Sequence, residues 1–502
     1  TDETAPVVAR ICALLDGLPL AIELAAARVK VFSPHVLLQR LDNRLALLTG
    51  GARELTPRQQ TMRGAIEWSW SLLDAEERSL FARLGVFAGG FTVGAAEVVG
   101  SPGDTLILDA LVSLVDKSFL RQVEWCDNGI PAEPRFVMLG TLREYALEQL
   151  RATGAEEDVR RKHAHYFVQF AEQAQAELGD AREEALAARM EEEHENFRAA
   201  LRWALEPGGD LTIALRLGSV LWPLWATRGY LSEGRAILTE TLERTRGLGD
   251  GLNHFRAAAA FGAGNLAWAQ GDLVSARAFT KESLALRRNL GDVRGVAASL
   301  NNLGLVLRDL GEVGAARSVT EESLALRREL GDARGVGWAL HNLGTLARME
   351  GDYARARSLA EEALALRRAK GNRYGVAASL GSLAKIARDE GDFAKAKKLA
   401  LESLQIRRDL GDTQGIADCL EIVGEVTRRQ GDGTRAVRFF AFSARLREVL
   451  QAPLPPAERS RYEQSLAQVQ AEMGESAFQA AWAAGRAMTL EQAARAVADG
   501  PG

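Results

Sequence analysis

The segment SLALRRNLGD at residues 283–292 returns with small changes at 323–332, 363–372 and 403–412, as SLALRRELGD, ALALRRAKGN and SLQIRRDLGD. The copies therefore follow one another with a constant period of about 40 residues. A Gly-Asp pair or a near variant also falls midway between them, so that such pairs recur at 271, 291, 311 and at the same interval up to 431. A fixed period of this kind is the signature of a repeat architecture. Each unit consists of two segments joined by short turns.

Each segment has the pattern of a helix. The apolar residues of 296–310 recur at spacings of three and four, which gives one apolar stripe: Val296, Leu300, Leu303, Leu307 and Leu310. The Gly of each Gly-Asp pair can take the left-handed conformation that ends a helix, and the Asp can cap the next helix. Paired arginines such as Arg327-Arg328 complement the dipole in the last turn. The sequence predicts antiparallel helix pairs stacked in tandem, an α-solenoid.

Small residues locate the family of these repeats. Gly304 is followed by Ala316, and Gly344 by Ala356 at the same spacing, which lets two helices approach closely. This pattern resembles the tetratricopeptide repeat, with a period of about 40 residues in place of the usual period of about 34. Five units agree across 251–450, and a degenerate unit is expected at 211–250.

The first 153 residues do not repeat. Helical segments at 61–73 and 74–84 are followed by two β-like segments, 119–123 and 135–139, and by a helix at 141–152. Helices followed by a two-stranded wing predict a winged-helix domain. The predicted chain is mainly α, in five parts: a helical bundle at 1–59, the winged helix at 60–153, a helical linker or N-terminal cap at 154–210, the solenoid at 211–451 and C-terminal capping helices at 452–502.

Three further segments carry a second resemblance: GLPLAIELAAARV at 17–29, LTPRQQTMRGAIEWSWSLL at 55–73 and VFAGGFTVGAAEVV at 86–99. Together with the repeats they resemble the C-terminal part of bacterial STAND signalling ATPases of the NB-ARC type, many of which are transcriptional regulators of the LuxR and antibiotic-regulator classes. In that family a P-loop ATPase precedes a helical bundle, a winged helix and a tetratricopeptide sensor. The resemblance therefore implies a sensory role for the solenoid.

The resemblance also sets expectations for nucleotide binding. No GxxxxGK[ST] motif occurs in the sequence, so we expect the chain to lack its ATPase domain and to hold no cofactor itself. ATP or ADP and Mg are expected only together with that domain. Pro19 matches the family proline that packs on adenine, and its alternative role is to start a helix. Leu139 and Gly140 replace the His and Asp of the family's Met-His-Asp-type motif, which puts nucleotide sensing there in doubt.

Composition and motifs exclude several other functions. The net charge is −5, and the candidate recognition helix at 104–117 carries three Asp and one Lys, which argues against binding to DNA phosphates. The three cysteines lie far apart, and His163 and His165 point in different directions on a helix, so no metal site is predicted. No catalytic set is recognisable, and we expect no enzyme activity. No apolar run is long enough to cross a membrane, and we expect a cytoplasmic chain.

The positions that change between repeats are the candidate ligand contacts. They lie on the first helix of each unit, which in tetratricopeptide repeats lines the concave groove. An arginine also recurs there once in each repeat, and such a row could bind an acidic peptide or anionic ligand; alternatively, these positions are merely exposed and the row complements helix dipoles. The predicted groove residues are Phe261, Asn265, Trp268, Asn301, Leu305, Arg308, Trp338, His341, Thr345, Arg348, Lys385, Arg388, Glu421, Glu425 and Arg428.

The leading functional hypothesis is a regulatory module of a STAND-type ATPase. Its solenoid would bind a protein, a peptide or a small-molecule inducer and relay that event through the winged helix to the ATPase domain. The chain itself would be a monomer or a weak dimer. Two alternatives stay open: a passive tetratricopeptide scaffold, and a DNA-binding regulator that acts through the winged helix.

Overall fold

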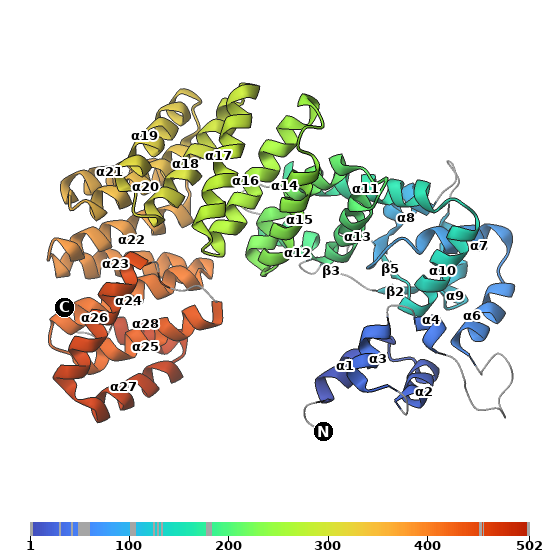
Figure 1. The fold of residues 1–502 in the computed structure, drawn as a ribbon. Coiled ribbons are helices and arrows are strands. Elements are labelled where there is room, and N and C mark those ends of the chain that lie inside the picture. The colour runs from blue at the N-terminus through green and yellow to red at the C-terminus, as the bar shows by residue number, and fades with distance from the viewer. Residues whose placement is uncertain are drawn as a thin grey trace. The chain divides into compact units, whose positions relative to one another are not determined.

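The computed structural model describes residues 4–29, 32–41, 44–48, 61–100, 107–123, 126–127, 130–131, 134–176, 183–450, 454 and 456–498. The chain forms two compact units, residues 1–266 and 267–502, and the boundary falls inside helix α16 (Asn253–Ala269). The described residues are mainly helical, with short strands in the first unit alone, which confirms the predicted fold class (Figure 1).

The first unit begins with four short helices, α1 (Ala5–Leu14), α2 (Pro19–Arg28), α3 (Pro34–Arg40) and α4 (Arg44–Leu47). Pro19 is the first residue of α2, where its missing N–H leaves no hydrogen bond unmade. This bundle contacts the domain that follows, because the Leu45 amide donates to both carboxylate oxygens of Glu144 at 3.3 Å. The predicted boundary at 59–60 lies outside the described residues.

A winged helix follows, and its main sheet contains one strand more than predicted, while a second, two-stranded sheet lies in the segment predicted as a loop. Three strands pair antiparallel in the order β1-β5-β2, with Phe91 and Gln122 both opposite Phe136. The expected two-stranded wing missed β1, because two residues are too short to show an alternating pattern. The recognition helix begins at Leu108, while residues 101–106 lie outside the described part. The elements are α6 (Met62–Ser71), α7 (Ala75–Leu84), β1 (Phe91–Thr92), α8 (Val93–Gly100), α9 (Leu108–Asp116), β2 (Arg121–Val123), β3 (Cys126–Asp127), β4 (Ile130–Pro131), β5 (Arg135–Val137) and α10 (Gly140–Ala152).

A buried polar joint ties the winged helix to the helices after it, α11 (Glu156–Ala176), α12 (Glu183–Glu192) and α13 (His194–Leu205). The Asn196 side chain accepts from the Ala88 amide at 2.9 Å and donates to the Gly90 carbonyl at 2.9 Å. Glu193, in front of α13, forms an ion pair with Arg135 of β5. Since buried polar groups need their partners, these contacts hold the two parts of this unit in one arrangement.

His163 of α11 packs in the same joint, and it gives the first unit a pH dependence. The ring is 2% exposed and lies between Phe87 and Phe167. Burial lowers the pKa of His163 to about 3, against an ordinary value of 6.5. Between these two pH values the unfolded chain binds a proton that the folded chain does not, so stability falls as the pH falls.

We expect the local unfolding free energy of α11 to fall by about 2 kcal/mol more in the native chain than in His163→Gln when the pH drops from 8 to 5. Hydrogen exchange, corrected for the intrinsic rate at each pH, measures this difference. The exposed His165, two residues along the same helix, provides the control substitution His165→Gln. Equal pH dependence in the native chain and in His163→Gln would contradict the burial argument.

Helix pairs make up the rest of the chain. The degenerate pair in the first unit is α14 (Leu211–Arg228) with α15 (Leu231–Arg244), followed by a short 3-10 helix at Asp250–Leu252 and by α16. In the second unit successive helices pack side by side (Figure 1). They are α17 (Leu273–Leu290), α18 (Val293–Asp309), α19 (Val313–Glu329), α20 (Ala333–Met349), α21 (Tyr353–Ala369), α22 (Arg373–Asp389), α23 (Phe393–Leu410), α24 (Thr413–Arg429), α25 (Gly433–Leu450), α26 (Pro456–Met473), α27 (Glu475–Ala487) and α28 (Leu490–Ala498).

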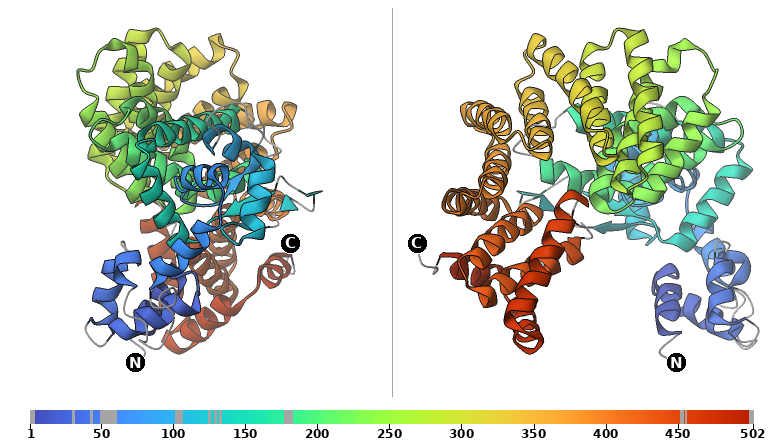
Figure 2. Two further views of the ribbon diagram at one scale, coloured as in Figure 1. Left: turned by 90° about the vertical axis from the view of Figure 1, so that its right-hand side faces the viewer. Right: turned by 60° about the vertical axis from the view of Figure 1, so that its left-hand side comes forward.

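The turns between these helices use the predicted chemistry. Gly331 has a left-handed φ of 65°, and the Asp332 side chain then accepts from the Gly335 amide at 2.9 Å, which caps α20. The last helices close the array, since α27 packs against α25 and α26 (Figure 2). Val437, Val469 and Phe478 share one apolar cluster there. Among the described helices, none has both the length and the apolar character that a membrane span requires.

A row of buried and half-buried arginines lies inside the array, one on the second helix of each pair. Arg367 donates to the carbonyls of Gly375 at 3.1 Å and Gly337 at 3.0 Å and to the Ser379 hydroxyl at 2.8 Å. It therefore joins α21 to both α20 and α22. The dipole explanation from sequence is incomplete for these residues, because their guanidinium groups also bridge neighbouring helices. The row consists of Arg287, Arg327, Arg367, Arg407 and Arg447.

Candidate ligand cavity in the repeat array

A cavity of about 520 Å³ lies within the second unit. Residues of α18, α20, α22 and α24, the first helices of four successive pairs, line much of it. Glu458, in the first turn of α26, also reaches it. This volume is within the range of about 300–1,000 Å³ that small-molecule sites have in proteins.

Two aromatic side chains border the cavity and are open to solvent. Trp338 of α20 is 40% exposed, and Tyr374 of α22 is 51% exposed. The Arg367 guanidinium carbon lies 5.5 Å from the centroid of the Trp338 ring, so a cation–π contact holds that ring in place. Trp338 therefore offers an exposed apolar surface to a ligand.

His341 adds a neutral polar group beside this surface. Its Nδ1 lies 3.1 Å from the Ser382 hydroxyl, which itself donates to the Ala378 carbonyl at 3.1 Å. The single hydroxyl proton is thus used, so the His341 N–H donates to Ser382. Burial, together with the neighbouring Arg367 and Lys385, lowers the pKa of His341 to about 3. The ring is therefore uncharged at neutral pH.

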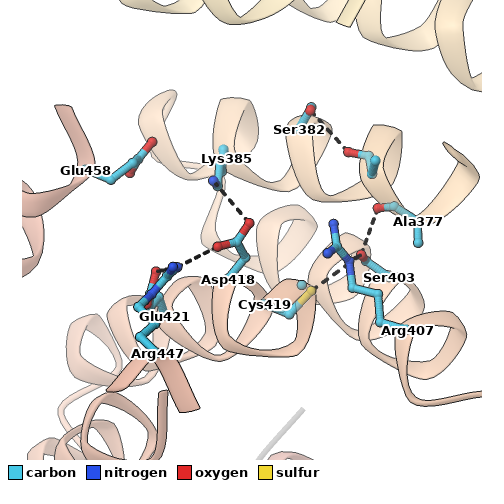
Figure 3. Close-up of polar contacts among 12 residues, drawn as sticks. Ala377, Ser382, Lys385, Ser403, Arg407, Asp418, Cys419, Glu421, Arg447 and Glu458 are labelled. Atoms are coloured by element: carbon cyan, nitrogen blue, oxygen red, sulfur yellow. Dashed lines mark hydrogen bonds and ion pairs between the residues drawn. The ribbon is translucent and has the colours of Figure 1, made fainter. Parts of the chain in front are cut away.

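Opposite charges meet at the α24 side of the cavity (Figure 3). The Lys385 ammonium lies 3.8 Å from the Asp418 carboxylate, which also accepts from Arg447 at 2.6 Å. Burial alone would raise the pKa of Asp418, but Lys385 and Arg447 outweigh it and keep this pKa below its ordinary value. Burial does raise the pKa of the adjoining Glu421, even though Arg447 binds it at 2.6 Å. The cavity thus presents both charge signs, each with a partner.

Cys419 is the thiol that lines this cavity, and it is inert. It is fully buried and lies 3.4 Å from the Ser403 hydroxyl (Figure 3). Burial raises the pKa of the thiol to about 11, so almost no thiolate exists at neutral pH. Among the described residues, no group of three or more His, Cys, Asp and Glu side chains is arranged to hold a metal ion.

The structure brings some of the predicted groove residues together and not others. Trp338 and His341 both line the cavity rather than lying sealed between helices. Those that line it are Arg308, Trp338, His341, Thr345, Arg348 and Lys385. Others lie elsewhere in the second unit: Trp268, Asn301, Leu305, Arg388, Glu421, Glu425 and Arg428. Phe261 and Asn265 belong to the first unit, as does Pro19. A role in binding stays a prediction for all of them.

Several of the predicted contacts serve the fold as well. Asn301 is 8% exposed, and its side-chain oxygen accepts from Asn342 at 3.0 Å. Glu425 accepts from Arg428 at 2.9 Å and from Ser465 of α26 at 2.5 Å. The side chains that vary between repeats are therefore not all free for a ligand.

Sequence reasoning missed two important groups at the cavity. Arg407 lines the cavity and belongs to the arginine row that recurs once in each repeat. The repeat pattern could therefore have indicated it. Glu458 follows the repeats and has no counterpart in them, so no pattern could have indicated its position.

Helix α9, the candidate recognition helix of the winged helix, presents an apolar and acidic surface. Leu108 is 50% exposed and Val112 is 51% exposed, and Asp109 is exposed beside them. Lys117, at the end of α9, is held by Glu77 at 2.5 Å. This surface offers little positive charge to a nucleic-acid backbone.

Comparison with known families agrees with this fold. A winged helix-turn-helix domain model matches residues 73–151, and two tetratricopeptide repeat models match residues 295–369 and 376–410. The predicted tetratricopeptide repeats and the predicted winged helix are thereby confirmed. None of these models describes a catalytic family.

Relatives are known from mycobacteria. "Putative HTH-type transcriptional regulator Rv0890c" of Mycobacterium tuberculosis is 40% identical over 248 residues, which are 49% of this chain and 27% of that protein. "Uncharacterized protein Rv0894" of the same organism is 37% identical over 171 residues, 33% of this chain and 42% of that protein. The chain thus spans about a quarter of the length of the first of these relatives.

Solved structures with a similar arrangement of helices are more distant. The alignment with a STAND protein with a tetratricopeptide repeat sensor from Pyrococcus horikoshii covers 94% of this chain and 70% of that protein's chain, at 14% identity and a TM-score of 0.43. BtubC from P. vanneervenii covers 49% of this chain and 92% of its own, at 20% identity and a TM-score of 0.36. The likeness concerns the helical architecture alone.

Proposed function

We propose that this chain is the sensory module of a transcriptional regulator. The solenoid binds a short peptide or a small polar inducer in the cavity, and the winged helix transmits that event to the rest of the regulator. The observation that carries the proposal is the position of the cavity: it opens at places where the otherwise similar repeats differ, such as Trp338, His341 and Lys385. Recognition of a particular ligand needs side chains that are not repeated.

The chemistry of the cavity suits a ligand with both polar and apolar parts. Trp338 and Tyr374 supply apolar contact, His341 supplies a neutral polar group, and Lys385 with Asp418 supplies both charges. Concave pockets with apolar walls and a few directed polar groups typically bind small ligands. The relatives named as HTH-type transcriptional regulators support the regulatory context.

The relay requires that the ligand favour one of two arrangements of the chain. The Asn196 joint and the Arg135–Glu193 ion pair couple the winged helix to α13 inside the first unit. Movement of α13 would therefore reach the three-stranded sheet. A ligand that binds without changing hydrogen exchange in β1, β5 and α13 would favour a passive scaffold instead.

The proposal is tested by selecting octapeptides from a random displayed library on the whole chain. We expect the selected peptides to bind Trp338→Ala at least tenfold more weakly than the native chain, because this ring forms the apolar wall of the cavity. Trp68→Ala is the matched control, since Trp68 is 50% exposed on α6, in the other unit. Selected peptides that bind both variants equally well would place their site outside the cavity and refute the proposal.

A further inference from the structure

The first turn of α26 inserts a carboxylate between two arginines of the repeat array. Arg348 of α20 donates to Glu458 Oε1 at 2.6 Å, and Arg388 of α22 lies 3.4 Å from Oε2. The Glu458 side chain is 14% exposed and borders the cavity, beside Lys385 (Figure 3). Burial would raise the pKa of Glu458, but Lys385, Arg348 and Arg388 lower it to about 2. This carboxylate is therefore ionised at neutral pH.

The repeats themselves leave this place short of negative charge. Among the described residues of α20 and α22, Asp389 is the carboxylate that meets these arginines, and it accepts from Arg348 at 2.7 Å and from Arg388 at 2.9 Å. Two guanidinium groups thus share one carboxylate of the array, and both turn a further N–H toward Glu458. A buried guanidinium that loses its acceptor is costly, so whatever replaces Glu458 must be an anion.

The two ends of α26 are held in different ways. Val469 lies in an apolar cluster with Val437 and Phe478, and Ser465 donates to Glu425 at 2.5 Å. None of residues 458–464 is fully buried, but Tyr462 packs edge-on against Phe440 and donates to its carbonyl at 3.1 Å. The contacts near Glu458 are polar, including the ion pair of Arg461 with Asp389. The first turn can therefore leave the array while the second half of α26 stays packed.

We propose that Arg348 and Arg388 form a carboxylate subsite at the edge of the cavity, that Glu458 fills it when no ligand is bound, and that the ligand is an acidic peptide whose side-chain carboxylate displaces Glu458. Arg348 and Glu458 line the cavity, and Arg388 adjoins it through Glu458. This inference rests on the proposed function, because it assigns a chemical class to the ligand of the same cavity. It also assigns α26 a role, that of an intramolecular competitor.

The exchange is balanced in its hydrogen bonds. A peptide carboxylate accepts from the same guanidinium N–H groups that Glu458 leaves, so little is gained or lost at the carboxylate subsite itself. The peptide adds contacts to Trp338 and Lys385, which Glu458 does not fill. Since the peptide binds one state of α26 and not the other, it shifts the population toward the released first turn.

The test uses a fluorescent hexaglutamate peptide, acetylated and amidated at its ends, and the same peptide made of glutamine. We expect Glu458→Gln to bind hexaglutamate at least tenfold more tightly than the native chain, because the neutral amide competes poorly for the two guanidinium groups. Arg348→Gln in the Glu458→Gln background should remove that gain. Hexaglutamine should not distinguish the three proteins. Glu463→Gln is the matched control, because Glu463 is an exposed carboxylate on the same helix.

Equal hexaglutamate affinity in Glu458→Gln and Glu463→Gln would overturn the carboxylate subsite, and so would a failure of Glu458→Gln to bind this peptide. Neither result touches the proposed function, which depends on the response of library-selected peptides to Trp338→Ala. The opposite result is also distinguishable. If hexaglutamate binds through Arg348 but the selected peptides bind Trp338→Ala as tightly as the native chain, the carboxylate subsite is supported and the sensory cavity is refuted.

Hydrogen exchange on the native chain provides a second measurement that needs no substitution. Saturating hexaglutamate should raise the exchange of amides at 458–461 and leave those at 466–473 protected, since the contacts before Tyr462 are polar and Tyr462 itself packs against Phe440. Unchanged protection of 458–461 in the peptide complex would show that Glu458 is not displaced, which contradicts the proposal.

Discussion

Arg367→Ala should lower the local unfolding free energy of α20 and α22 by about 3–5 kcal/mol. The Arg367 guanidinium is buried and donates to the carbonyls of Gly337 and Gly375 and to Ser379. Without it three buried acceptors lose their donor, at about 1–3 kcal/mol each when water does not replace it. Hydrogen exchange resolves the effect helix by helix, which a single melting temperature of a repeat array does not.

The next residue provides the control for this prediction. Arg368 lies on the surface, with its side chain 55% exposed, and pairs with Glu402 at 3.0 Å. Arg368→Ala should change the same free energy by less than about 0.5 kcal/mol, because exposed ion pairs contribute little. Arg367→Met separates packing from hydrogen bonding, since it keeps the side-chain stem and removes the donors. A loss in Arg367→Met close to zero would show that the hydrogen bonds are not what stabilises this position.

Gly304→Ala should destabilise α18 and α19 by about 2 kcal/mol, whereas Gly344→Ala should stabilise α20 by about 0.5–1 kcal/mol. The two glycines occupy the same position in successive repeats. A Cβ at residue 304 would lie 2.2 Å from the Thr320 hydroxyl, which is buried and donates to the Ala316 carbonyl at 2.7 Å. A Cβ at residue 344 meets nothing closer than 3.5 Å, because Ala360 stands where the other repeat has Thr320. Hydrogen exchange in these helices measures both effects.

The double substitution Gly304→Ala with Thr320→Ala tests the cause. It recreates the pair Ala384 and Ala400 that a later repeat already contains. We expect it to recover most of the stability lost in Gly304→Ala, as neighbouring substitutions that share one contact are not additive. A double variant as unstable as the sum of the two single variants would mean that Thr320 is not the obstacle.

These two sites show how far sequence reasoning reached. The constant repeat period, the left-handed glycines and the capping aspartates were predicted, because each depends on residues close in the chain. The buried role of Arg367 was missed, since a basic residue in a last turn usually complements the helix dipole. Its burial depends on Gly337 in the first helix of the same pair, whose lack of a side chain leaves the guanidinium room.

The candidate site divides in the same way. Trp338, His341 and Lys385 could be chosen because they break the repeat, and the structure places all three at one cavity. Arg388 and Arg428 were chosen because an arginine recurs at their position in each repeat, but carboxylates of this chain already bind them. The short strand β1 escaped prediction because two residues cannot show a period.

The amino-acid sequence by itself determined the repeated helix pairs, their turns and the winged helix, since a fixed spacing of apolar residues, glycine and aspartate acts over a few turns of chain. Tertiary structure alone decided that Glu458 meets Arg348 and Arg388. Arg348 and Arg388 lie 110 and 70 positions before Glu458 in the chain, and only the packing of α26 on the array brings the three residues together. Electrostatic contacts of that kind follow from distance in space, which no local pattern encodes.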